Sequence, residues 1–336
     1  MSGTIFRHDD GLWPNTVALL YAVVGYGTGL TLIVSHLWWL NIMGIMLLAH
    51  ALVIAAYLLH EFAHGTVFKS NRANQRGGEV MSWLTGVAYA SFVDLRRKHM
   101  RHHIDRADVV TFDYKAFLRS RPAWVRHVVT ALEWGYVPAI EFLMRGYVML
   151  LPFIKPERRA GRGRILLVLT LRIAFFALLG WVAPKALLLY FAAYAIFVTV
   201  LRFADAYQHT YDAFAVLVSG EIPKDKVRDR DYEQHNTYSN LVSVAHPWLN
   251  LLLLNFSYHN AHHEKPSAPW YRLPALDRAL FGDDDRQVLP MRDLLKGFHR
   301  DRVQRVLSED YGVVTAGAHK AEGFYGAVGV SFLTAV

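Results

Sequence analysis

Histidines gather in three short windows of the chain, and their spacing within each window suits metal binding. The windows are residues 60–64, 99–103 and 259–263, and together they hold eight of the 17 histidines. Within a window the histidines recur after three or four residues, which places them on one face of a helix with Cβ atoms about 5–6 Å apart. Neutral imidazole is a good ligand for iron, copper, nickel and zinc. The windows therefore predict a metal centre.

Candidate ligands also occur outside the windows. His209 lies shortly after an apolar stretch, with Asp205 one turn before it on the same expected helical face, and His235 stands in a polar segment nearby. Nine histidines exceed the four to six ligands that one ion takes, so the count favours two metal ions. The predicted metal ligands are His60, His64, His99, His102, His103, His209, His259, His262 and His263, with Asp205 and His235 as further candidates.

Four long apolar stretches must position these histidines. They cover residues 16–34, 42–59, 165–182 and 186–203, and the third contains an internal charge, Arg172. Each is close to the roughly 20 residues that a helix needs to cross a bilayer. Short links join the first to the second and the third to the fourth. The sequence therefore predicts an all-α integral membrane protein with four transmembrane helices arranged as two hairpins.

The charged residues predict the orientation of these helices. The net charge is +8, and the two hairpin links carry a single cation, Lys185, whereas the longer loops carry nearly all the others. By the positive-inside rule both termini and the histidine windows are cytoplasmic. We expect one domain over residues 1–336, with a cytoplasmic cap formed by residues 60–164 and 204–290 and a tail of soluble character at 291–336. Within the cap, residues 124–153 are predicted to form one amphipathic surface helix.

The amino-acid composition further restricts which metal sites and partners are possible. The chain has no cysteine, which excludes disulfides, cysteine–zinc sites, iron–sulfur clusters and haem–thiolate. Any redox metal must be held by nitrogen or oxygen ligands, and electrons must come from another protein. The basic balance is compatible with nucleic acid or with an anionic membrane surface. The apolar stretches favour the membrane, and we expect no nucleic-acid partner.

The three windows read HxxxH, HxxHH and HxxHH, and between residues 60 and 263 their order relative to the apolar stretches resembles the membrane fatty acid desaturase and hydroxylase superfamily. The resemblance implies a four-span scaffold beneath a cap that holds two non-haem iron ions. It implies O₂ as co-substrate and attack on a C–H bond of a fatty acyl chain, either free or linked to coenzyme A, an acyl carrier protein or a lipid. It also implies an external donor such as a ferredoxin, a rubredoxin or a cytochrome b5-type protein.

In the same family a polar residue and a histidine stand four apart after the fourth span, and Asp205 and His209 resemble this segment. The family often has asparagine at the first position, so Asp205 departs from the pattern. The resemblance implies no catalytic residues beyond the metal ligands.

Alternative functions make different use of the same residues. Residues 60–64 are formally HExxH, the motif of zinc proteases in which Glu61 would be the general base, but this reading leaves the other histidines unexplained. A metal or haem transporter would place its ligands near mid-membrane, whereas these histidines follow the spans. Among oxygenases we expect fatty acid desaturation, with hydroxylation and decarboxylation to a terminal alkene as open alternatives.

Overall fold

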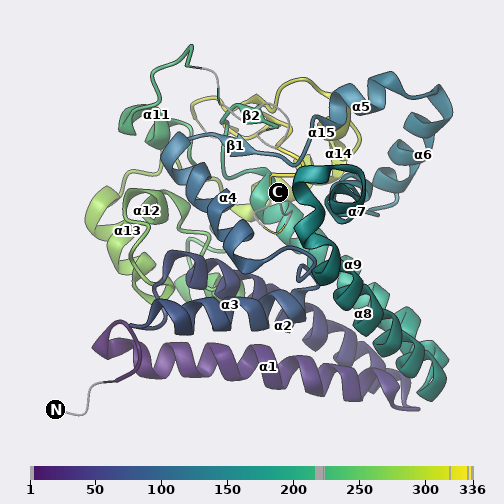
Figure 1. Ribbon diagram of the computed structural model, residues 1–336. Helices are drawn as coiled ribbons and strands as arrows, with labels where there is room; N and C mark the ends of the chain where they lie inside the picture. Colours follow the sequence, from purple (N-terminus) through teal and green to yellow (C-terminus); the bar gives the residue numbers. More distant parts are fainter. Residues whose placement is uncertain (1–3, 216–221, 223, 318, 331–332, 334–336) are drawn as a thin grey trace. The chain divides into compact units, whose positions relative to one another are not determined.

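A computed structural model describes residues 4–215, 222, 224–317, 319–330 and 333 of the chain. The chain forms two compact units, and their boundaries fall inside helices α4, α7 and α9. Unit 1 contains residues up to 96 and residues 146–200, and unit 2 contains residues 97–145 and those from 201 onward. Figure 1 shows the elements of both units.

Unit 1 is mainly helical in the residues that are described. Its own elements are η1 (Asp9–Gly11), α1 (Leu12–Val34), α2 (Trp38–His64), α3 (Asn71–Thr85), η2 (Pro156–Gly161) and α8 (Arg162–Val182). The helices that cross a unit boundary are α4 (Phe92–Asp105), α7 (Ala139–Ile154) and α9 (Pro184–Ala206).

Four helices are long and apolar enough to cross a membrane, namely α1, α2, α8 and α9. They coincide with the four predicted apolar stretches, so the expected four-span helical membrane fold is confirmed. Each helix extends a few residues beyond its stretch, because the backbone hydrogen-bond ladder continues past the last apolar side chain. Helix α2 extends as far as His64 and therefore includes the first histidine window.

Both α1 and α3 pack against α2 (Figure 1). Small residues allow α1 and α2 to approach closely. A Cβ atom at Gly29 would lie 2.8 Å from that of Leu48, and one at Gly44 would lie 2.8 Å from that of Leu32. Close backbone approach through glycine is a common basis of helix association in membranes, where lipid removes the hydrophobic driving force between helices.

The turns of the two hairpins meet within unit 1. Lys185, at the start of α9, donates to the Ser35 carbonyl at 2.6 Å and to Oδ1 of Asn41 at 3.0 Å. The amide of Asn41 in turn donates to the carbonyls of Leu32 and Ser35. The two hairpin turns therefore lie at the same end of the helices.

Arg172, the charge inside the third span, is bound by α3. Its guanidinium donates to the Trp83 carbonyl and lies 6.0 Å from the centre of the Trp83 ring. About two turns earlier on α8, Arg164 pairs with Glu79 at 2.6 Å. An intramembrane arginine is costly unless it finds such acceptors, so these contacts explain how α8 tolerates the charge.

Unit 2 combines short helices with two small sheets. Its elements are β1 (Asp108–Val109), α5 (Tyr114–Ser120), α6 (Ala123–Trp134), β2 (Ala213–Phe214), α11 (Arg230–His235), η3 (Pro247–Leu253), α12 (His259–Glu264), η4 (Trp270–Arg272), α13 (Leu273–Phe281), α14 (Met291–Arg300), α15 (Gln304–Leu307), β3 (Gly312–Val313) and β4 (Gly323–Phe324). Strand β1 pairs with β2 in parallel, and β3 pairs with β4 antiparallel.

The single surface helix expected over residues 124–153 is wrong, because the chain forms α6 and α7 with a bend of 119° between them. The break contains Gly135, Tyr136 with φ +60°, and Pro138. A left-handed residue and a proline cannot continue a helix.

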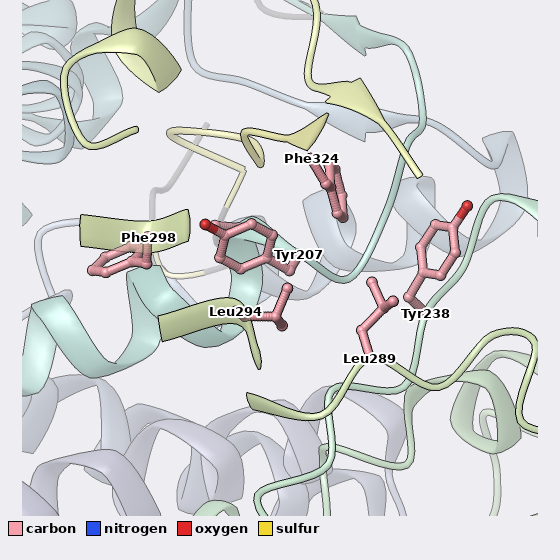
Figure 2. Packing of buried hydrophobic residues seen from close by; sticks show 7 residues of the cluster. Tyr207, Tyr238, Leu289, Leu294, Phe298 and Phe324 are labelled. Atoms are coloured by element: carbon pink, nitrogen blue, oxygen red, sulfur yellow. The ribbon is translucent and has the colours of Figure 1, made fainter. Parts of the chain in front are cut away.

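The C-terminal tail is also more integrated than its polar composition indicated. Figure 2 shows Phe298 and Phe324 packed with Tyr207, Tyr238, Leu289 and Leu294 in one buried cluster. Tyr207 follows the end of α9 directly. The tail is therefore part of the core of unit 2 and contacts the segment that leads to His209.

Candidate metal centre

Unit 2 brings four histidines from three separate parts of the chain into one cluster. They are His102 on α4, His209 just beyond α9, and His259 and His263 on α12, and each offers a ring nitrogen within 4.8 Å of the others. The Nε2 atoms of His209 and His259 are 2.8 Å apart. Three of the four are buried, and His102 is half-buried. We refer to these four residues as the four-histidine cluster.

A second set of histidines lies beside it in the same unit. Nε2 of His103 is 3.2 Å from Nε2 of His99 and 3.2 Å from Nε2 of His262. The two sets adjoin at His103 and His263, whose ring centres are 4.4 Å apart. The helical spacing explains the division, because on α12 the pair His259 and His263 and the single His262 project in different directions.

These distances fit metal binding. Two imidazole nitrogens that share one ion at about 2.1 Å lie roughly 3 Å apart, which is close to the three Nε2 separations in the two sets. Nε2 of His263 is buried and has no hydrogen-bond partner among the described residues. An unpaired buried nitrogen is costly in a folded protein, and a metal ion would satisfy it.

In three histidines of the four-histidine cluster, the Nδ1 atom has a hydrogen-bond acceptor. Nδ1 of His263 lies 2.9 Å from Oε1 of Glu233, and Nδ1 of His102 lies 3.1 Å from the Ala107 carbonyl. A carboxylate or a carbonyl can only accept, so Nδ1 carries the proton in both rings. Nε2 is then the deprotonated nitrogen that can bind a metal ion. Such outer partners commonly orient metal-binding histidines.

His209 reaches the same protonation state through a hydroxyl group. The Thr237 hydroxyl donates to the Glu233 carbonyl at 2.7 Å, and its oxygen lies 3.3 Å from Nδ1 of His209. Because a hydroxyl has one proton, this oxygen accepts from His209. His209 therefore also presents Nε2 toward the cluster.

The electrostatics keep His209 and His263 neutral. Burial, followed by repulsion from the neighbouring imidazoles, holds the pKa of His209 well below its usual value. Burial also lowers the pKa of His263 to about 4, although Glu233 opposes this shift. For Glu233, burial works against ionisation, but hydrogen bonds from His263 and Arg106 outweigh it and lower the pKa. Neutral imidazoles with an ionised outer carboxylate are the states that metal binding requires.

Asn260, inside the third window, explains how α12 is held in place. Its side chain donates to the Thr237 carbonyl at 2.8 Å and accepts from the Ser239 hydroxyl at 3.0 Å. The same segment bears Thr237, the partner of His209. Residues 237–239 thus fix α12 and the His209 imidazole together.

Unit 1 holds the other two predicted ligands. His60 and His64 occupy the last turns of α2 with ring centres 4.6 Å apart, His60 buried and His64 half-buried. Between them, Glu61 is buried and accepts a 2.6 Å hydrogen bond from the Thr66 hydroxyl. The helical spacing predicted for the first window is therefore present, with the two rings on one face of α2.

The two additional candidates lie outside these clusters among the described residues. Helix α9 ends at Ala206, so His209 is not on a helical face shared with Asp205. Asp205 is close enough to Lys98 to influence its charge. His235 is exposed, and its Nδ1 lies 2.6 Å from the Asp231 carbonyl.

Sequence reasoning missed the outer partners Glu233, Thr237 and Asp108, the last of which lies 3.4 Å from Nδ1 of His102. Their spacing relative to the histidines follows no helical or strand period. The one available signal was proximity in sequence, since Glu233 lies two residues before the candidate His235.

A cavity of about 650 Å³ lies next to the four-histidine cluster within unit 2. Tyr211 contributes to its lining, and the ring of Tyr211 stacks on His209 with centres 4.2 Å apart. Part of the cavity wall comes from residues 309–312 of the C-terminal tail. Tyr211 therefore contacts both the cavity and His209.

The chain matches a family model of known proteins. A family model described as "Fatty acid desaturase" matches residues 37–295, which is more than half of the chain and includes the nine histidines predicted as metal ligands. No curated protein sequence matches the chain.

Proposed function

Because the chain belongs to the fatty acid desaturase family, whose members are oxygen-dependent oxidoreductases, we propose that it introduces a double bond into a fatty acyl chain. Its spans, its histidine clusters and its enzyme class agree with the predicted desaturase-like membrane protein. The observation that carries the proposal is the four-histidine cluster, in which at least three rings present Nε2 to a common centre. Family membership also sets aside the zinc protease reading of residues 60–64.

The proposed cofactor is a pair of iron ions. The four-histidine cluster has enough nitrogen donors for one ion, and His99, His103 and His262 supply donors for a second. We keep His60 and His64 as proposed ligands because the first window is part of the family pattern. The three nitrogens of His99, His103 and His262 are also fewer than the four to six ligands that one ion usually takes. Iron would supply the redox chemistry for attack by O₂ on a C–H bond, which zinc lacks.

The residues of the protein have defined tasks in this proposal. Glu233, Thr237 and the Ala107 carbonyl hold protons on Nδ1 atoms and so fix which nitrogen each ring offers. Burial keeps the His209 and His263 rings neutral. Since pre-formed ligands need not reorganise when the ion binds, this arrangement favours tight binding.

The proposed orientation places the termini and the histidines in the cytoplasm. The shared end of the two hairpin turns, joined by Lys185, supports it, because an even number of spans then returns both chain ends to one side. The excess of Lys and Arg in the longer loops favours the cytoplasm for that side. Electrons would come from an external ferredoxin, rubredoxin or cytochrome b5-type protein, since the chain has no cysteine for a cluster of its own.

One experiment tests the reaction directly. The purified protein, loaded with iron, is incubated with fatty acids of graded length, O₂ and a reducing system, and the products are analysed by mass spectrometry. Desaturation appears as the loss of two hydrogens, hydroxylation as the gain of one oxygen, and decarboxylation as a terminal alkene one carbon shorter. The first outcome supports the proposal. Either of the others replaces desaturation, and unchanged acids in the presence of bound iron contradict all three.

The matched control is a histidine outside the clusters. His246 is exposed and is not among the predicted ligands, so His246→Ala should retain both iron and activity. His102→Ala should lose activity. Equal activity in the two variants would refute the ligand assignment of His102.

A further inference from the structure

The chain continues for about 40 residues beyond the family match, and this C-terminal segment (described over residues 296–317 and 319–330) is packed into unit 2. Arg305 is 2% exposed and Phe324 is fully buried. In Figure 2, Phe298 and Phe324 lie on either side of Tyr207. A segment with such buried contacts is not a peripheral extension.

Arg305 is the centre of these contacts. Its guanidinium donates to the Tyr207 hydroxyl at 2.8 Å, to the Tyr325 carbonyl at 2.5 Å and to the Phe298 carbonyl at 3.3 Å. Its carbon Cζ lies 4.3 Å from the centre of the Phe298 ring. The planar guanidinium can satisfy several acceptors in fixed directions, which a lysine cannot do. Arg305 therefore binds Tyr207 to two points of the C-terminal segment.

The same segment also binds the end of α9. The Ala327 amide donates to the Ala206 carbonyl at 2.7 Å, which satisfies one of the carbonyls that a helix end leaves unpaired. Gly326 has φ +83°, and a Cβ there would lie 2.7 Å from the same carbonyl oxygen. A residue with a side chain would be excluded from this close approach.

His209 is two residues after Tyr207, beyond the last residue of α9. Its position is therefore not set by helical geometry, unlike the positions of His102, His259 and His263. On one side the backbone around His209 is held by residues 236–238. The Thr210 amide donates to the Asn236 carbonyl, and the Tyr238 amide donates to the Gln208 carbonyl. On the other side it is held by the C-terminal segment. Removing one side leaves the His209 backbone free to shift.

We propose that Arg305 is a positioning residue which, through Tyr207, holds the His209 imidazole in the four-histidine cluster. The C-terminal segment then acts as a clamp on a metal ligand. The proposal rests on the proposed function, because it takes His209 to be a ligand. It adds a dependence of metal affinity on residues that lie outside the family match.

The test measures binding of Co²⁺ to the purified, metal-free, full-length protein, by titration and by the visible spectrum, without O₂ or substrate. The variants are Arg305→Lys, Tyr207→Phe, His209→Ala and the double variant Arg305→Lys with His209→Ala. Tyr207→Phe keeps the buried ring and removes only the hydroxyl, so it tests the contact even if Arg305→Lys does not fold. Arg292→Gln is the control, since Arg292 is an exposed arginine on α14.

We expect Arg305→Lys and Tyr207→Phe to weaken one class of Co²⁺ sites about tenfold and to change its spectrum, while Arg292→Gln matches the wild type. In the His209→Ala background, Arg305→Lys should have little further effect, because the contact acts through His209. Unchanged affinity and spectrum in both single variants would overturn the proposal. So would full additivity in the double variant, which would indicate a general structural role.

The outcome for His209→Ala separates this inference from the proposed function. If His209→Ala weakens Co²⁺ binding and the Arg305 and Tyr207 variants do not, the positioning role of Arg305 is refuted and the assignment of His209 as a ligand stands. If His209→Ala binds Co²⁺ as tightly as the wild type, the assignment of His209 as a ligand fails, and the clamp fails with it.

Discussion

Oε1 of Glu233 lies 2.9 Å from Nδ1 of His263, and its second oxygen lies 2.8 Å from Nε of Arg106. This carboxylate connects a buried imidazole of the four-histidine cluster to a cation of the same unit. It sets the proton on Nδ1 and leaves Nε2 for a metal ion. The affinity of the centre should therefore depend on a residue that binds no metal itself.

Glu233→Gln tests this dependence. The amide keeps the shape of the side chain but loses the charge that favours the proton on Nδ1, so metal affinity should fall about 10- to 100-fold, as for other outer partners of metal ligands. Titration with Fe²⁺ against a chelator measures the change. Glu309→Gln, at an exposed ion pair, is the control. Identical affinity in the two variants would show that Glu233 has no such role.

Loss of single histidines should distinguish the two sets. His263→Ala and His262→Ala each remove a donor from a different set, so each should lower the iron content by about one equivalent and abolish acyl oxidation. His235→Ala should retain both irons, because His235 is exposed and lies outside the sets. Elemental analysis of the purified variants measures this. Iron loss in His235→Ala alone would require a different ligand set.

Metal removal should abolish activity reversibly. Dialysis against a strong chelator should stop acyl oxidation, Fe²⁺ should restore it, and Zn²⁺ should occupy the site without restoring it, since zinc has no redox chemistry. Product analysis before and after each addition provides the measurement. Activity recovered with zinc alone would exclude a redox role for the metal.

The glycine pair in α3 allows two aromatic rings to pack against the helix. A Cβ at Gly77 would overlap the ring of Phe62, which lies between His60 and His64 on α2, and one at Gly78 would overlap Phe92. Gly77→Ala gains about 1 kcal/mol of helix propensity but forces overpacking that costs roughly 1–3 kcal/mol, so we expect net destabilisation. Thermal unfolding in detergent measures it.

The matched control for that substitution is Gly146→Ala on α7, where a Cβ meets nothing within 4 Å. Helix propensity is then the main effect, and this variant should be as stable as the wild type or more stable. A higher unfolding temperature for Gly77→Ala than for Gly146→Ala would contradict the overlap.

Asp277 on α13 should make stability depend on pH. Burial raises its pKa to about 6, so the folded state takes up a proton at a higher pH than the unfolded chain. As the pH falls from 7.5 to 5, the folded state should gain about 1 kcal/mol after allowance for partial exposure. Asp277→Asn cannot titrate and should lack this gain. The measurement is the unfolding temperature of the wild type and of Asp277→Asn at the two pH values. An equal pH dependence of the two proteins would rule out a contribution of Asp277.

Several features could be predicted from the sequence because they depend on local chemistry. A bilayer requires about 20 apolar residues with every backbone group paired internally, so the four spans follow from hydropathy. Histidines three or four residues apart share a helical face wherever the helix lies. The three windows on α2, α4 and α12 therefore indicated a metal centre and the family without knowledge of the fold.

The tertiary structure alone decided how the histidines are divided and oriented. His262 and His263 are adjacent in sequence but project toward different partners, because neighbouring residues on a helix point about 100° apart. Glu233, Thr237 and Ala107 determine which ring nitrogens are free, and their places along the chain follow no period. His209 lies beyond the end of α9, where no helical rule applies, and long-range contacts with residues 236–238 and with the C-terminal segment fix its position.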